Sequence, residues 1–268
     1  MKNCVLITGA TGGLGRSYVY EFAKRGFDLV LSATKQSRLE ELKSEILKEY
    51  PNIKIYAKEC NLAFEESRAE LFKFLDENNI KINALVNNAG YMFEGSFEGC
   101  ELEEILSCVK VNVEGTLDLT HRFLRRREKT EKNYILIVSS SAAFYPMPQM
   151  ATYSATKVLL TTMVKALRSE YKGKNVNILS VNPGSMATND KMKASIKSQG
   201  LGGKLSLQET DKVARVSVKK LFKNKCMYVP GFFNKLTHLL AVITPTGIST
   251  AYVKRRWTKC EKKRGCYR

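Results

Sequence analysis

Short apolar runs alternate with amphipathic stretches along most of the chain. The runs predict strands of about five residues, nearly continuous in apolar side chains, as is typical of strands buried on both faces. They cover Cys4–Thr8, Leu29–Ala33, Ile53–Ala57, Ala84–Val86, Tyr134–Val138, Val176–Val181 and Met227–Val229. Helical spacing covers Leu14–Arg25, Arg38–Tyr50, Glu65–Glu77, Glu101–Arg127, Tyr153–Tyr171 and Thr210–Phe222. This alternation predicts a parallel sheet with helices on both faces.

We therefore predict an α/β fold with one doubly wound, Rossmann-type domain over residues 1–253. Its mainly parallel seven-stranded sheet is expected to have the order 3-2-1-4-5-6-7. Within this domain, residues 185–207 have few large apolar anchors and end in a glycine-rich stretch, which predicts a mobile lid over the substrate. Residues 254–268 are predicted to form a separate basic tail.

The chain is strongly basic, with 44 Lys and Arg residues against 26 Asp and Glu residues and a formal net charge of +18. Residues 254–268 hold eight basic residues against Glu261 alone, and residues 122–132 hold a second basic cluster. Such an excess can favour nucleic acid, anionic lipid or an anionic small molecule. We interpret most of these charges as a solvated surface, because no zinc-finger or RNA-binding signature predicts a nucleic-acid partner.

Cysteine and histidine usage narrows the chemistry further. Seven cysteines, an odd number without any C-x-x-C pair, favour a reducing compartment, and we expect a cytoplasmic protein. The N-terminus lacks a signal-peptide pattern, and Leu236–Val253 is too polar and broken to span a bilayer. With only two histidines, neither near a loop serine motif, we expect no metal site and no Ser-His-Asp hydrolase.

A glycine-rich turn follows the first predicted strand and opens the first predicted helix. Glycines at such a place permit a tight turn and a close approach of the backbone to a pyrophosphate. The N-terminus of the helix then offers free N–H groups and a partial positive charge. The spacing is G-x-x-x-G-x-G, and no Lys-Ser/Thr pair follows, which excludes a Walker-type loop. The candidate cofactor residues here are Gly9, Thr11, Gly12, Gly13, Leu14 and Gly15.

The end of the second strand predicts which nicotinamide cofactor is bound. NAD-specific enzymes place an acid there for the ribose 2′-hydroxyl, whereas this chain has Thr34 and Lys35 and no acid. A lysine suits a 2′-phosphate, so NADP(H) is preferred and NAD(H) stays possible.

Tyr153 and Lys157 lie four residues apart in a predicted helix, so their side chains share one face. A nearby ammonium stabilises phenolate and is expected to lower the pKa of Tyr153, which suits a general acid or base. Ser140 ends the preceding strand and can face the start of this helix across the crevice. Its hydroxyl could hydrogen-bond the substrate oxygen as that oxygen gains charge.

With these motifs in family order and spacing from residue 3 to about residue 190, the chain resembles the short-chain dehydrogenase/reductase family. The Ser139 to Thr188 stretch is most similar to the branch that acts on hydroxysteroids and long acyl chains. The resemblance implies that Tyr153 exchanges the proton, Ser140 orients the substrate oxygen and Lys157 holds the nicotinamide ribose. Asn112 is implied to bend its helix and to position a water that links Lys157 to solvent. Implied cofactor contacts are Asn61, Leu62, Asn88, Ala89, Gly90, Pro183, Gly184, Met186 and Thr188.

Three positions depart from the usual pattern of this family. Asn61 replaces a frequent Asp, Gly12 stands where NADP enzymes often place a basic residue, and Thr34 replaces a frequent Arg. Adenine binding is still expected, because Asn61 can both donate and accept, but the other two departures weaken the preference for NADP(H).

We predict a bulky apolar alcohol or ketone as substrate, such as a hydroxysteroid or a bile acid. Met and aromatic side chains near the site motivate this prediction. The candidate substrate residues are Ser140, Ala142, Tyr145, Met147, Tyr153 and Met186. The first alternative is a reductase of 3-oxoacyl thioesters, and the second is a non-catalytic NADP(H)-binding sensor.

The expected partner is a second copy of the chain. The family resemblance implies a homodimer or homotetramer formed through the helices at Glu101–Arg127 and Tyr153–Tyr171. The apolar residues of 232–243 before the basic tail leave peripheral membrane contact open as an alternative. We favour packing of this segment over the substrate pocket or at a subunit interface.

Overall fold

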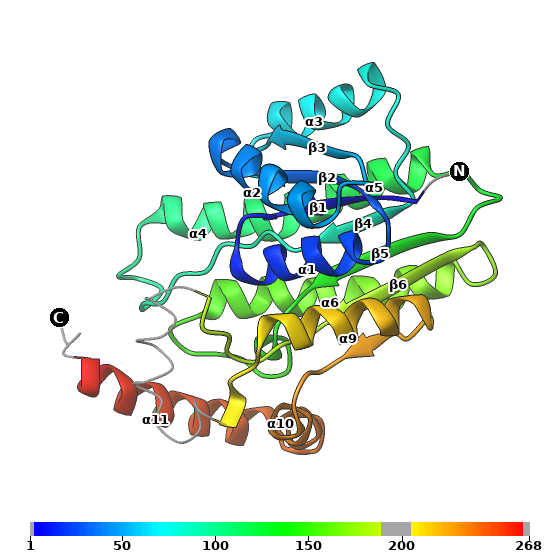
Figure 1. Cartoon of the computed structure of the whole chain (residues 1–268). Coiled ribbons are helices and arrows are strands. Elements are labelled where there is room, and N and C mark those ends of the chain that lie inside the picture. The colour runs from blue at the N-terminus through cyan, green and yellow to red at the C-terminus, as the bar shows by residue number, and fades with distance from the viewer. Residues whose placement is uncertain (1–2, 189–204, 265–268) are drawn as a thin grey trace.

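Seven parallel strands form one sheet in the order β3-β2-β1-β4-β5-β6-β7, which confirms the predicted architecture (Figure 1). The structure is a computed structural model that describes residues 3–188 and 205–264, with side chains described as far as Arg255. The strands are β1 (Cys4–Thr8), β2 (Asp28–Ala33), β3 (Ile55–Glu59), β4 (Ala84–Asn87), β5 (Asn133–Val138), β6 (Val176–Val181) and β7 (Met227–Tyr228).

Helices cover both faces of the sheet because alternate strand residues point to opposite sides. In β1, Val5 and Ile7 pack into one core, whereas Leu6 packs into the other. The first core is completed by α1 (Gly13–Ala23), α2 (Gln36–Glu49) and α9 (Thr210–Phe222). The second is completed by α3 (Glu65–Glu77), α5 (Gly115–Arg126) and α6 (Ala151–Glu170).

The long helix predicted over Glu101–Arg127 is not uniform. It consists of α4 (Leu102–Val109), a π-helical turn η1 (Lys110–Glu114) and α5. Asn112 lies in this turn, and its side chain accepts from the Tyr91 N–H at 2.8 Å and donates to the Tyr91 carbonyl at 2.9 Å. Such turns inside α-helices are frequent at functional sites.

The C-terminal segment is helical, and the domain boundary expected at residue 254 stays a prediction. The chain forms α10 (Phe232–Ile243) and then α11 (Thr246–Arg264), and α11 runs through the position where the basic tail was expected to begin. Residues 251–264 contain no Gly or Pro and are rich in Lys and Arg, which are good helix formers. Pro245 and Gly247 do mark the break between the two helices.

Residues 189–204 lie outside the part of the chain that the structure describes, so most of the predicted lid at 185–207 does too. Among the described helices, none combines the length and the apolar character that crossing a bilayer requires.

Candidate active site

A cavity of about 1030 Å³ lies at the carboxyl ends of the strands, where a doubly wound sheet binds its ligands. The glycine turn, the ends of β2, β3, β4, β5 and β6, and the start of α6 contribute to its walls. The predicted cofactor residues that line it are Gly9, Thr11, Gly12, Gly13, Leu14, Gly15, Thr34, Asn61, Leu62, Asn88, Ala89, Gly90, Tyr153, Lys157, Pro183, Gly184, Met186 and Thr188.

The glycine turn is shaped by backbone contacts that leave no room for side chains. Gly9 adopts a φ of +62°, a left-handed conformation that favours glycine. A Cβ on Gly15 would lie 2.0 Å from the Gly9 carbonyl oxygen, and a Cβ on Gly13 would lie 2.8 Å from Thr188 Cγ2. At Gly12, the N-cap residue, no side chain satisfies the first N–H groups of α1. They remain available to an anion in the cavity.

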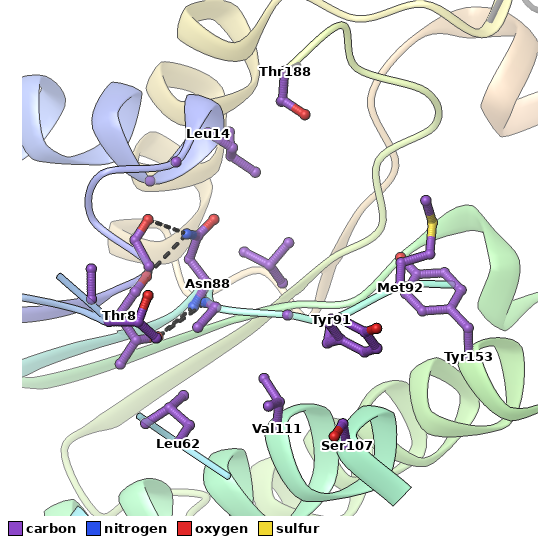
Figure 2. Close-up of a pocket in the computed structure, with 18 of the residues that line it drawn as sticks. Thr8, Leu14, Leu62, Asn88, Tyr91, Met92, Ser107, Val111, Tyr153 and Thr188 are labelled. Carbon is purple, nitrogen blue, oxygen red and sulfur yellow. Dashed lines mark hydrogen bonds between the residues drawn. The ribbon is translucent and has the colours of Figure 1, made fainter. Parts of the chain in front are cut away.

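Thr8 and Asn88 hold the turn against the end of β4 (Figure 2). The Asn88 amide donates to the carbonyl oxygens of Thr8 and Gly9 at 3.0 and 3.2 Å. In return, the Thr8 hydroxyl oxygen accepts from the N–H groups of Asn88 and Ala89 at 3.0 and 3.1 Å. These bonds fix two adjacent strand ends at the spacing that the cavity needs.

Ser140, Tyr153 and Lys157 line the same cavity. Ser140 follows β5 and its hydroxyl oxygen accepts from the Ala142 N–H at 3.1 Å, which starts a short 3₁₀ turn. Tyr153 and Lys157 lie one turn apart on α6, with the Lys157 ammonium 5.5 Å from the centroid of the Tyr153 ring. Ser139 ties the two elements together, because its hydroxyl donates to the Lys157 carbonyl at 2.8 Å.

Lys157 is buried almost completely, with 4% of its surface exposed. Its ammonium donates to the Val138 carbonyl at 3.1 Å. A Cβ on Gly90 would stand 3.5 Å from Lys157 Nζ, so the loop after β4 lies within van der Waals range of the amine. Lys157 therefore has one fixed position, between the end of β5 and the loop after β4.

The electrostatics of the pair correct one expectation. Burial raises the pKa of Tyr153 to about 12, and a hydrogen bond with Ser140 opposes this only in part. Burial also lowers the pKa of Lys157 to about 8. The sequence predicts the opposite direction, in which the Lys157 ammonium lowers the pKa of Tyr153. Desolvation by burial has the larger effect on the pKa of Tyr153.

Asn112 does not line the cavity, although it belongs to the predicted catalytic set. It is fully buried, and its amide donates to the Tyr91 carbonyl, Cys108 Sγ and Thr156 Oγ1. Its side chain therefore positions the loop after β4 against α6. The predicted role in holding a water near Lys157 stays a prediction.

Four other predicted residues also lie outside the cavity lining. Lys35 is exposed and follows Thr34, which does line it. Ala142 is buried behind the wall. Tyr145 and Met147 pack instead in an apolar cluster around Met150 and Val253, together with Met92 and Tyr153.

One wall of the cavity was missed by the sequence analysis. Its residues come from the loop after β4 and from the cavity-facing side of α4. Met92 lies beside the Tyr153 ring, and Tyr91 lies above Ser107 and Val111 (Figure 2). The helical spacing of Glu104, Ser107 and Val111 ahead of Asn112 could have revealed the α4 part, but loop residues carry no such signal. The missed residues are Tyr91, Met92, Phe93, Glu94, Glu101, Glu103, Glu104, Ser107 and Val111.

Several residues that line the nucleotide end of the cavity were also not predicted from the sequence. The additional lining residues there are Thr8, Ser32, Ala33, Cys60, Ala63 and Phe64, with Val138 and Ser139 at the end of β5. The buried Arg68 shapes the loop after β3, because it donates to the Leu62 carbonyl at 2.7 Å and pairs with Asp118 at 2.7 Å.

Comparisons with known proteins agree with this geometry. A family model described as short chain dehydrogenase matches residues 3–199. A very-long-chain 3-oxoacyl-CoA reductase from Caenorhabditis briggsae is 33% identical over 190 residues, which are 68% of this chain and 59% of the relative. The human 17-beta-hydroxysteroid dehydrogenase type 3 is 30% identical over 194 residues, 70% of this chain and 60% of the relative. The chain thus spans about 60% of the length of these two relatives.

A solved structure shows the same fold. It is a short-chain dehydrogenase from Sphingobium yanoikuyae in complex with NADPH, with a TM-score of 0.76 and 24% sequence identity. The match covers 91% of this chain and 96% of that chain.

Proposed function

Because the chain belongs to the short-chain dehydrogenase family, we propose that it is an NADP(H)-dependent oxidoreductase that interconverts a secondary alcohol and a ketone. One observation carries the proposal. Ser140, Tyr153 and Lys157 line the same cavity as a glycine turn whose helix N-terminus has no side-chain cap. A proton-exchanging group and a phosphate cradle therefore belong to one site.

The residues on the nucleotide side fit a dinucleotide. The uncapped start of α1 suits the pyrophosphate, and Asn61 and Leu62 border the place for the adenine. Thr34 at the cavity edge and the adjacent exposed Lys35 suit a 2′-phosphate, which supports NADP(H) over NAD(H). The Sphingobium yanoikuyae neighbour was solved in complex with NADPH, which agrees with this assignment. When bound, the nicotinamide supplies or accepts the hydride.

The chemical roles follow from the positions of three side chains. In ketone reduction, the Tyr153 hydroxyl donates its proton to the substrate oxygen, and in alcohol oxidation the phenolate accepts it. Ser140 orients that oxygen by a hydrogen bond. The Lys157 ammonium, fixed by Val138, favours the phenolate and holds the cofactor ribose.

The substrate side favours a bulky apolar molecule such as a hydroxysteroid or a bile acid. Met92, Phe93 and Met186 line the cavity, and Met92 packs with Tyr145, Met147 and Tyr153 in one apolar cluster. The similarity to a 17-beta-hydroxysteroid dehydrogenase supports the same class.

A second candidate is the reduction of 3-oxoacyl thioesters, which the similarity to very-long-chain 3-oxoacyl-CoA reductases supports. The charge on the cavity wall opposes it. Glu94, Glu101, Glu103 and Glu104 line the cavity, and Lys157 is the only basic residue among the described residues that do so. An anionic carrier such as coenzyme A would be repelled at this wall.

The test is a nicotinamide absorbance assay with the full chain. NADP⁺ and NAD⁺ are each combined with a hydroxysteroid panel, and NADPH is combined with 3-oxoacyl-CoA substrates. We expect turnover of at least one hydroxysteroid with NADP⁺. Efficient reduction of the thioesters without steroid turnover would select the second candidate, and cofactor binding without any turnover would select a sensor.

We also propose a cytoplasmic homodimer or homotetramer. Leu117 on α5 and Val158 and Leu159 on α6 expose 41%, 44% and 40% of their surfaces on the helices implied to form the subunit contact. Free thiols at all five cysteines that the structure describes support a reducing compartment. Light scattering on the wild type and on a Val158→Glu variant measures the assembly. A monomeric wild type would contradict the proposed assembly.

A further inference from the structure

The two C-terminal helices carry the largest concentration of exposed apolar side chains among the described residues. Eight of the seventeen exposed large hydrophobic residues lie between residues 232 and 252. Scattered single residues of this kind are ordinary, whereas a contiguous patch marks an interaction surface. We define the C-terminal patch as Phe232, Leu236, Leu239, Leu240, Val242, Ile243, Ile248 and Tyr252, with exposed fractions between 42% and 83%.

The charge around this patch is of one sign. Residues 232–260 contain no Asp or Glu, and Glu261 is the first acid after Asp211. Lys235, Lys254 and Arg255 are exposed. The sequence continues with Arg256 and then with four further Lys and Arg residues before Gly265. Apolar residues next to a basic stretch match the apolar interior and the anionic headgroups of a lipid bilayer.

The helices that carry the patch also contact residues at the candidate active site. Val253 of α11 packs on Met150 in the cluster that contains Met92 and Tyr153. Asn234 of α10 is buried and lies directly against Gly184. A Cβ on this glycine would lie only 2.5 Å from Asn234 Nδ2. Figure 1 shows α10 and α11 together at the lower edge of the molecule. One face of these helices is thus fixed to the site, and the other is exposed.

We propose that the C-terminal patch docks on an anionic phospholipid bilayer and holds the substrate side of the cavity close to the lipid. The apolar side chains enter the headgroup boundary, and the basic residues pair with lipid phosphates. A second copy of the chain fits less well, because a twofold contact through this patch would bring two basic helices together. The proposal deepens the proposed function, since a bulky apolar substrate dissolves in a bilayer.

Vesicle flotation of the full chain tests the docking without any activity measurement. Phosphatidylcholine vesicles are compared with vesicles that also contain phosphatidylglycerol. We expect the wild type to float with the anionic vesicles and to stay largely unbound with the neutral ones. Each basic residue near the surface contributes about 1 kcal/mol, so Lys254→Glu/Arg255→Glu should weaken anionic binding by at least about tenfold. Leu239→Glu/Val242→Glu should abolish it.

A matched control uses two exposed lysines far from the patch. Lys24 ends α1 and Lys172 follows α6, both at the opposite end of the strands from the cavity, and Lys24→Glu/Lys172→Glu changes the net charge equally. This variant should float as the wild type does, and circular dichroism should show that all three variants are folded.

Failure of the wild type to bind anionic vesicles would overturn the proposal, whatever the enzyme assay shows. Equal loss in the control and the Lys254→Glu/Arg255→Glu variant would overturn it too, because net charge alone would then explain binding. If Leu239→Glu/Val242→Glu turned a dimer into a monomer in light scattering while the wild type ignored lipid, the patch would be a subunit contact.

Discussion

The two ends of the cavity are built in different ways. At the nucleotide end, the walls consist mainly of backbone, with Gly9, Gly13 and Gly15 so close to their neighbours that side chains do not fit. At the substrate end, the walls consist of side chains such as Met92, Met186 and Tyr153. A backbone wall recognises what all dinucleotides share, whereas a side-chain wall can change its specificity by substitution. Tyr153 and Lys157 lie where the two walls meet.

The largest expected effect is at this meeting point. Tyr153→Phe removes the hydroxyl that we propose exchanges the proton, and it should lower kcat by about 10²- to 10⁴-fold. Cofactor binding and thermal unfolding should stay close to those of the wild type, because the ring is kept. Tyr145→Phe, in the same apolar cluster, is the control and should retain most activity. Wild-type turnover by the Tyr153→Phe enzyme would remove Tyr153 from the mechanism.

The backbone wall is tested by two glycines in one turn. In Gly15→Ala the new Cβ would meet the Gly9 carbonyl oxygen at 2.0 Å, so we expect a stability loss of about 1–3 kcal/mol and much weaker NADPH binding. In Gly12→Ala the same oxygen lies at 3.4 Å, an ordinary contact, and stability should change by less than about 0.5 kcal/mol. Chemical denaturation measures both. Equal losses would show that the turn is not packed as described.

We expect the buried ammonium of Lys157 to support activity and to lower the free energy of unfolding. Burial lowers its pKa from an ordinary 10.5 to about 8, so the folded protein binds this proton less tightly than the unfolded chain does. The buried ammonium therefore costs stability fully below pH 8, and the cost is relieved as pH rises from 8 towards 10.5. A shift of this size corresponds to at most about 3 kcal/mol.

We expect Lys157→Met to lose activity and to gain about 1–3 kcal/mol of stability at pH 7. The gain is smaller than the maximum if the Val138 carbonyl is left without its donor. Urea unfolding at pH 7 and pH 10 measures the gain, which should shrink at the higher pH. A gain that grows with pH would contradict the assigned direction of the pKa shift.

The smallest expected effect is on the side-chain wall. Met92→Ala should raise KM for a bulky apolar ketone by about tenfold and leave NADPH affinity unchanged, because it removes apolar contact only near Tyr153. Val158→Ala, exposed on the outer side of α6, is the control. An equal rise in KM for a small ketone would argue against a specificity role for Met92.

The difference between the two walls also explains what the sequence could predict. Strand runs and the glycine turn carry strong local patterns, and Cys4–Thr8, Glu65–Glu77, Val176–Val181 and Thr210–Phe222 agree with the structure residue for residue. A shared site for Ser140, Tyr153 and Lys157 could be predicted from the sequence, because each residue follows or begins an element of predictable position.

The rest depends on contacts between distant segments. The placement of Met92 and Glu94 follows from how Asn112 binds the Tyr91 backbone, and no periodicity shows this. The raised pKa of Tyr153 follows from burial, which depends on how distant segments pack around the hydroxyl. At the C-terminus, Pro245 lies between the two helices α10 and α11, which the sequence analysis did not predict.

The most direct test of the central claim is the pH dependence of alcohol oxidation by the wild type and by Tyr153→Phe. In the proposed mechanism oxidation needs the phenolate, and burial raises the pKa of Tyr153 to about 12, so the phenol is mostly protonated at neutral pH. The account predicts that wild-type kcat/KM rises about tenfold per pH unit through the neutral range, and that the small residual rate of the variant does not. A flat wild-type profile, or the same rise in the variant, would contradict it.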